Sequence, residues 1–180
     1  MLIQQLFEKA SFTLAQLDAV AVSEGPGSYT GLRIGVSAAK GLCYALGKPL
    51  IAVPTLKAMA YGAITEIKDR DALYCPVIES IKDEVFAALY SASSEEIAAP
   101  CPISADLINL QHLIHRKTVF IFGPGLKKVK ASPNVQPIHL SNSAKNMTVL
   151  SENLFIEGKF CSLEYFEPLY LKNFIPRNPA

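Results

Sequence analysis

The stretch from Val20 to Leu46, VAVSEGPGSYTGLRIGVSAAKGLCYAL, limits the possible folds of this chain more than any other part of the sequence. It begins with an apolar run, passes through a loop with two glycines, and continues with helical periodicity as far as Gly47. A second short apolar run follows at residues 50–53. This order predicts residues 18–22 and 50–53 as adjacent parallel strands, joined by a helix over residues 31–46 that crosses one face of the sheet.

The expected helix has two apolar faces that differ in side-chain size. One is an ordinary core stripe at i, i+4 spacing, made of Ile34, Ala38, Leu42 and Leu46. The other is made of small residues, Gly31, Gly35, Ala39 and Cys43. Glycine inside a helix costs about 1 kcal/mol relative to alanine, and it is usually tolerated where another backbone comes close. The small-residue stripe could pack on the chain's own sheet or dock against a helix of a second chain, and the spacing leaves both open.

The loop before this helix also has two possible roles. A strand–glycine–helix turn directs backbone N–H groups out of the helix N-terminus, which suits an anion. The loop lacks the Gly-Lys-Ser/Thr of a P-loop, its glycines are spaced one residue too far apart for a dinucleotide motif, and Tyr29 stands where a nucleophile elbow has serine. Its candidate residues, for contact with an anion or with a partner, are Gly25, Pro26, Gly27, Ser28 and Thr30.

The residues of this region closely resemble a known family. Ser-Glu-Gly-Pro-Gly-Ser-Tyr-Thr-Gly-Leu-Arg-Ile-Gly at residues 23–35 is followed by Ala-Lys-Gly-Leu and by Pro-Leu-Ile-Ala-Val-Pro-Thr-Leu. These runs are similar to the signature of the TsaB family, the YeaZ-like, glycoprotease-like subunits of the bacterial machinery that makes threonylcarbamoyladenosine in tRNA. The similarity extends from Leu17 to Ala60, and weaker landmarks follow at residues 84–90 and 167–172.

The resemblance implies an α/β fold of the actin, hexokinase and heat-shock ATPase type (ribonuclease H-like), with two related lobes. In that plan each lobe begins with three strands, and residues 2–10 correspond to the end of the first helix. We therefore expect a truncated first lobe at residues 1–68, without its opening strands, and a second lobe at residues 69–180. The charged connector at residues 68–71 marks the expected boundary.

For function, the resemblance implies a non-catalytic subunit that binds and activates the catalytic subunit TsaD in threonylcarbamoylation of the adenosine next to the anticodon. TsaE is a further expected partner, and tRNA is expected to be contacted only within the complex. ATP and Mg²⁺ are expected in the partner subunits, with no cofactor on this chain. The implied contact is a helix bundle, which can also pair two copies of the chain as a homodimer. Its residues here would be Leu6, Gly31, Arg33, Gly35, Ala38, Ala39, Leu42 and Cys43.

Two enzymatic alternatives stand beside this interpretation, a glycoprotease-like metallopeptidase and an ATP-binding, kinase-like enzyme. His112 and His115 lie three residues apart on an expected helix and could share a metal ion, but no third ligand and no H-E-x-x-H motif accompany them. The His-rich motif of the family's catalytic subunit is also missing from the sequence. We therefore assign no catalytic residue and no metal ligand.

Composition and charge limit the class of protein, the partners and the cellular compartment that are expected for this chain. Half of the residues are hydrophobic and 18% are charged, as in globular proteins. The net charge of +1 gives no field that would hold tRNA by itself. No apolar run reaches the length of about eighteen residues that suggests a membrane span, and the N-terminus lacks a signal-peptide pattern. The four cysteines form no C-x-x-C pair, so we expect reduced thiols in a cytoplasmic protein without membrane partners.

The rest of the chain is predicted to continue the α/β pattern. Strands are expected at residues 73–78, 84–90 and 118–122, and helices at residues 55–68, 104–116 and 144–157. The tail from residue 163 is expected to be extended. At residues 79–83 the family usually carries Asp-Ala-Arg, whereas this chain has Glu-Ser-Ile-Lys-Asp, which puts any role of that arginine in doubt. The lysines at positions 127, 128 and 130 are interpreted as a solvated basic loop.

Overall fold

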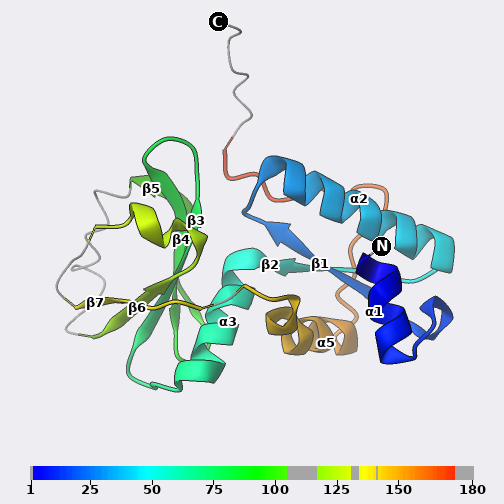
Figure 1. The fold of residues 1–180 in the computed structure, drawn as a ribbon, viewed down its shortest axis with the longest axis horizontal. Helices are drawn as coiled ribbons and strands as arrows, with labels where there is room; N and C mark the ends of the chain where they lie inside the picture. Colours follow the sequence, from blue (N-terminus) through cyan, green and yellow to red (C-terminus); the bar gives the residue numbers. More distant parts are fainter. Residues whose placement is uncertain (1, 105–116, 131–133, 141, 173–180) are drawn as a thin grey trace, which may run out of the picture.

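Two β-sheets organise the fold, and they lie side by side in the computed structural model (Figure 1). The first sheet has two strands in the order β1-β2, and the second has five in the order β5-β4-β3-β6-β7. The structure describes residues 2–104, 117–130, 134–140 and 142–172. Within these ranges the chain is a mixed α/β protein, as the sequence predicts.

The first sheet confirms the predicted strand–helix–strand unit. β1 (Val20–Gly25) and β2 (Leu50–Pro54) are parallel neighbours, and α2 (Tyr29–Leu46) connects them across one face of the sheet. The Ser28 hydroxyl caps α2 by accepting a hydrogen bond from the backbone N–H of Gly31 at 3.3 Å. The helix ends at Gly47, whose φ of 62° places it in the left-handed region that glycine adopts readily.

Helices cover both faces of this first sheet. On one face, α2 contributes Ala39 and Cys43 to a core cluster with Leu50 of β2. On the other face, α5 (Thr148–Ile156) packs two leucines against β2. A 3₁₀ turn, η4 (Ala144–Met147), leads into α5, so the helix predicted over residues 144–157 is confirmed with a tighter first turn.

The second sheet is mixed. Its strands are β3 (Leu73–Glu79), β4 (Glu84–Ser91), β5 (Glu96–Ser104), β6 (Val119–Phe122) and β7 (Val135–Pro137). β3, β4 and β5 form an antiparallel meander, whereas β6 pairs in parallel with β3 and with β7. The strands predicted at residues 73–78, 84–90 and 118–122 are confirmed, while β5 and β7 were not predicted from the sequence.

Helix α3 (Thr55–Ile67) lies between the two sheets and contacts both (Figure 1). Leu56 and Met59 pack with Tyr74 in the main core of the second sheet. Ala58, on another side of the helix, packs with residues of β2 in the first sheet. Because α3 contributes to both cores and α5 returns to the first sheet, the division of the chain at residue 68 stays a prediction.

The N-terminal segment is helical, as predicted, with α1 at Leu2–Ala10 and a 3₁₀ turn, η1, at Leu14–Gln16. A further 3₁₀ helix, η3 (Pro124–Lys128), follows β6. The helix predicted over residues 104–116 lies outside the described residues, apart from Ser104, which ends β5. Among the helices in the described ranges, none has the length and apolar content needed to cross a membrane.

Two of the four cysteines are core residues. Burial raises the pKa of the Cys75 thiol to about 12, and burial also raises the pKa of the Cys43 thiol. Both side chains are therefore protonated near neutral pH and pack as small apolar groups, as the sequence suggested. Cys101 on β5 is exposed to solvent.

Candidate functional site

Helix α2 rests on its sheet through a face that combines two residues of the small-residue stripe, Ala39 and Cys43, with two larger residues that the sequence analysis did not assign to the core. The buried residues of this helix are Leu32, Val36, Ala39 and Cys43. The predicted core stripe is wrong at its N-terminal half, because Ile34 is 66% exposed and Ala38 is also exposed. Apolar residues occur all around α2, so helical spacing alone could not decide which face meets the sheet.

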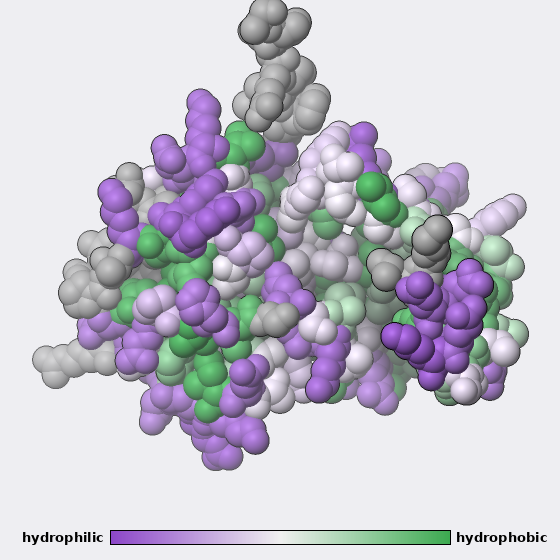
Figure 2. All heavy atoms as spheres, viewed as in Figure 1, coloured by the Kyte–Doolittle hydropathy of each residue, from purple (hydrophilic) through white to green (hydrophobic). Residues whose placement is uncertain are grey.

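The opposite side of α2, which we call the α2 outer face, carries no charged side chain. It consists of Gly31, Ile34, Gly35, Ala38, Gly41 and Ala45, all of them exposed. A Cβ atom added at Gly35 or Gly41 would meet no heavy atom within 4 Å in the described part of the chain. Packing on the chain's own sheet therefore does not explain these two glycines. Figure 2 shows pale and green spheres with some purple ones along α2, while green and purple spheres are mixed over the second sheet.

An apolar groove lies beside this face, between α1, the following turn and α2. The groove has a volume of about 610 Å³, and its apolar lining includes Ile3, Phe7 and Phe12, with Leu42 from α2. Phe12 of the lining is 54% exposed, and Leu6 of α1, outside the lining, is 63% exposed. An exposed apolar area next to an uncharged helix face is typical of protein-binding surfaces.

Of the eight predicted partner-binding residues, the structure buries two and leaves the others wholly or partly accessible. Leu6, Gly31, Gly35 and Ala38 are exposed, and Leu42 lines the groove. Ala39 and Cys43 face the sheet and are only 5% and 0% exposed, so they cannot contact a partner in this structure.

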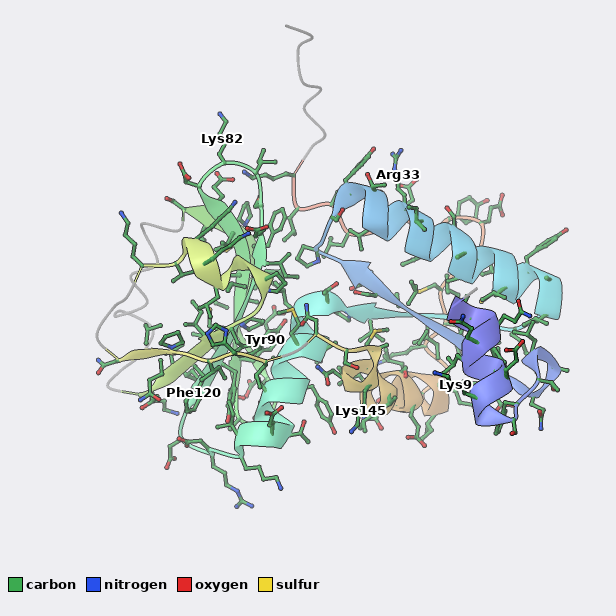
Figure 3. All side chains as sticks on the ribbon, viewed as in Figure 1. Lys9, Arg33, Lys82, Tyr90, Phe120 and Lys145 are labelled. Atoms are coloured by element: carbon green, nitrogen blue, oxygen red, sulfur yellow. The ribbon has the colours of Figure 1, made fainter. Side chains whose placement is uncertain are left out.

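Arg33 is exposed, but it lies on the opposite shoulder of α2 from Gly35. Its Nε donates to the Tyr170 hydroxyl at 3.4 Å, and its guanidinium lies 4.2 Å from the centre of the Tyr29 ring. Lys40 lies on the same shoulder and donates to the backbone carbonyl of Glu164 at 3.5 Å. Both side chains are thus bonded to the C-terminal segment, and Figure 3 shows Arg33 projecting from the N-terminal half of α2.

The loop between β1 and α2 is held by contacts within the chain. The backbone N–H of Gly25 donates to the Thr55 hydroxyl at 3.1 Å, and the carbonyl of Glu24 accepts from the backbone N–H of Leu169 at 2.7 Å. Gly25 has a φ of 114°, and a Cβ there would lie 2.7 Å from the carbonyl oxygen of Leu169, so only glycine fits. Ser28 caps α2, Thr30 is exposed, Gly27 is half-buried and Pro26 is buried.

A cleft of about 390 Å³ separates this loop from the second sheet. Its walls are formed by residues 26–29, 79–81 and 169–172, with Phe86 at the base of the β3–β4 hairpin. Burial raises the pKa of the Glu24 carboxyl at the end of β1. Tyr29 and Tyr170 place their ring centres 5.1 Å apart at the mouth of the cleft. The apolar and aromatic lining favours an apolar or planar group over a free anion.

Lys128 fixes the β3–β4 hairpin in a way that the sequence did not reveal. Its Nζ donates to the backbone carbonyls of Ser80 at 2.7 Å, Lys82 at 2.6 Å and Glu84 at 3.4 Å. The neighbouring Lys127 forms an exposed ion pair with Glu79 at 3.0 Å. The interpretation as a solvated basic loop is therefore wrong for Lys128, whereas the Lys127 side chain remains 73% exposed.

The two lysines give a matched test of this interpretation. Lys128→Met is expected to lower the free energy of unfolding by about 1.5–3 kcal/mol, because three carbonyls lose a charged donor. Lys127→Met should cost less than about 1 kcal/mol, because an exposed ion pair contributes little. Urea unfolding of both variants measures the difference, and equal losses would show that the Lys128 ammonium has no special role.

In the described part of the chain, no group of three or more His, Cys, Asp or Glu side chains is placed to hold a metal ion. His112 and His115 lie outside the described residues.

Known proteins resemble this chain over most of its length. The family model of TsaD, tRNA N6-adenosine threonylcarbamoyltransferase, matches residues 1–160. The tRNA threonylcarbamoyladenosine biosynthesis protein TsaB of Escherichia coli (strain K12) is 28% identical over 184 residues, covering 96% of this chain and 78% of that protein. TsaB of Bacillus subtilis (strain 168) is 33% identical over 88 residues, covering 49% of this chain and 37% of that protein.

A solved structure has the same fold. It is a Pseudomonas aeruginosa protein described as uncharacterized, with similarity to peptidase YEAZ, and it superposes with a TM-score of 0.80 at 24% sequence identity. The superposition covers 94% of this chain and 81% of that one. The described α/β architecture is therefore that of a YeaZ-like protein.

Proposed function

Because the chain belongs to the TsaD family, tRNA N6-adenosine threonylcarbamoyltransferase, and is TsaB-like over nearly its whole length, we propose that it acts in tRNA threonylcarbamoyladenosine biosynthesis. Within that pathway it is a non-catalytic subunit that binds the transferase TsaD and holds it in an active arrangement. TsaE belongs to the same complex, ATP and Mg²⁺ are bound by the partner subunits, and tRNA is contacted only in the assembly. The complex works in the cytoplasm.

The observation that supports this proposal most is the α2 outer face with the adjoining groove. Exposed glycines at positions 35 and 41 allow a second helix to approach the backbone closely, since no side chain among the described residues fills the space above them. Ile34 and Leu6, at 66% and 63% exposure, supply apolar side chains that a partner would cover. A helix of TsaD laid against α1 and α2 would exclude water from both, and a second copy of this chain would use the same surface.

We also propose the two-lobed, actin-like plan, with the first lobe at residues 1–68 and the second at residues 69–180. The side-by-side sheets and the position of α3 between them support this plan (Figure 1). The return of α5 to the first sheet means that the C-terminal residues stabilise both lobes.

A second candidate function is catalysis by the chain itself. Two findings favour it. The family model that matches the chain is that of the transferase, and the description of the similar solved structure mentions a peptidase. Peptidase, kinase or transferase turnover by the purified chain alone would support this candidate and contradict the non-catalytic role.

The test is an add-back assay in which TsaD, TsaE, tRNA and the threonylcarbamoyl donor are combined with and without this chain. We expect formation of threonylcarbamoyladenosine only when the chain is present, and none when the chain replaces TsaD. Modification at the same rate without the chain would show that it is not an activator.

A further inference from the structure

The segment after α5 runs along the first sheet and ends on the second. We call residues 161–172 the strap. It begins at the edge of β2, where the backbone N–H of Cys161 donates to the carbonyl of Leu50 at 2.8 Å. It then reaches the end of β1, where Leu169 donates to the carbonyl of Glu24. In Figure 1 the strap is the orange-to-red segment that passes behind α2.

Apolar side chains of the strap belong to the cores of both sheets. Leu163 and Phe166 pack against the cluster formed by α2 and β2. Leu171 packs against the cluster formed by α3 and the second sheet. The strap therefore connects the two cores by a route separate from the chain that links α3 to β3.

An aromatic contact anchors the strap on the first turns of α2. The Tyr170 ring stacks at a 40° tilt on the Tyr29 ring, and its hydroxyl accepts a hydrogen bond from Arg33. Arg33 also lies over the face of the Tyr29 ring, which adds a cation–π contact. Three side chains thus hold the strap to α2 beside the mouth of the cleft.

The last described residue of the strap contacts the other wall of the cleft. Lys172 forms an ion pair with Glu84 of β4, with the two side chains 27% and 36% exposed. The hairpin that carries Glu84 is held by Lys128, so the ion pair joins the strap to a fixed structure. Within the cleft, the Ser80 hydroxyl is shielded from solvent and has no hydrogen-bond partner among the described residues.

We propose that the strap is a latch across the cleft. The Lys172–Glu84 ion pair holds the cleft closed, and its release separates the hairpin from the loop at residues 26–29. The aromatic anchor at Tyr170 keeps the strap on the first sheet when this happens. The ion pair is the releasable contact because it is a single electrostatic contact between two partly exposed side chains, whereas the Tyr170 side chain is held by both a ring contact and a hydrogen bond. This inference does not depend on the proposed function.

Thiol labelling at position 80 measures opening of the cleft. Ser80→Cys places a nearly isosteric thiol where the shielded hydroxyl lies, and Cys101→Ser removes the exposed native thiol from the background. Adding Lys172→Met should increase the rate at which a soluble thiol reagent modifies position 80 by about two- to fivefold, the effect of losing a partly exposed ion pair. Lys159→Met, which removes an exposed ion pair with Glu157 outside the strap, is the matched control and should leave the rate unchanged.

Two further measurements separate a latch from general destabilisation. The charge swap Glu84→Lys with Lys172→Glu should restore slow labelling at position 80. The buried thiols of Cys43 and Cys75 should keep their slow labelling in Lys172→Met, because they report on unfolding of the two cores. An unchanged rate at position 80, or an equal increase at all three positions, would overturn the proposal. Hydrogen exchange of residues 25–29 and 79–84 in Lys172→Met gives the same comparison without the thiol at position 80.

Discussion

Replacing Ile34 by aspartate is expected to weaken binding of this chain to TsaD about a hundredfold, which corresponds to about 3 kcal/mol. The isoleucine side chain is 66% exposed in the free chain, so a partner covers it at the proposed interface. The variant loses the burial of an apolar side chain and places a carboxylate where water is excluded. Titration calorimetry with purified TsaD measures the dissociation constant.

The free chain should tolerate this change. Because Ile34 is exposed and outside the buried face of α2, the melting temperature of Ile34→Asp should stay within a few degrees of the parent. Tyr44→Asp is the control, since Tyr44 is 85% exposed on the same helix but lies to one side of the outer face. Loss of affinity in both variants would indicate a general effect of negative charge on α2, and unchanged affinity in both would place the interface elsewhere.

Replacing Gly123 by alanine should produce the largest loss of stability among the glycine substitutions considered. Gly123 has φ 114° and ψ 179°, a region that residues with a Cβ essentially do not adopt. Its Cβ would also clash with the carbonyl oxygen of Val77 and with the Met59 side chain. Strain and overpacking together should lower the free energy of unfolding by about 3–5 kcal/mol.

Gly158 after α5 provides the comparison for this prediction. It also has a positive φ, of 67°, but a Cβ there would meet no described heavy atom within 4 Å. Gly158→Ala should therefore cost only about 1–2 kcal/mol, the strain of a left-handed residue. Urea unfolding of both variants distinguishes the contributions, and equal losses would mean that the contact with the β3 backbone relaxes at no cost.

The helices and strands that were predicted correctly are those marked by a local sequence pattern, either an apolar run or helical spacing. The apolar run at residues 19–22, the capped helix and the second run at residues 50–53 are each encoded by neighbours in the chain, and all three are confirmed. β3, β4, β6 and α3 were also predicted, because each is a compact apolar run or a segment of helical spacing between polar connectors. β5 was missed because Glu96–Ser104 contains two prolines and has no compact apolar run, and its position depends on pairing with β4.

The candidate site was only partly predictable, because its properties depend on which side of α2 meets the sheet. The spacing of apolar and small residues predicted the helix. In the structure, however, Leu32 and Val36 are buried against the sheet, whereas Ile34 and Ala38 are exposed. The environment of Arg33 depends on Tyr170, 137 residues later in the chain, and the role of Lys128 depends on carbonyls 44–48 residues before it. Contacts of such long range leave no periodic signal in a single sequence.

The concentration dependence of tRNA modification tests the central claim most directly. In the add-back assay with fixed TsaD and TsaE, the parent chain should raise the rate of threonylcarbamoyladenosine formation to a plateau. Ile34→Asp should reach the same plateau only at about hundredfold higher concentration, because the substitution affects docking and not chemistry. A lower plateau at saturating Ile34→Asp would place Ile34 in the chemistry rather than in docking. Full stimulation by Ile34→Asp at the parent's concentration would contradict the assignment of the α2 outer face as the surface that binds TsaD.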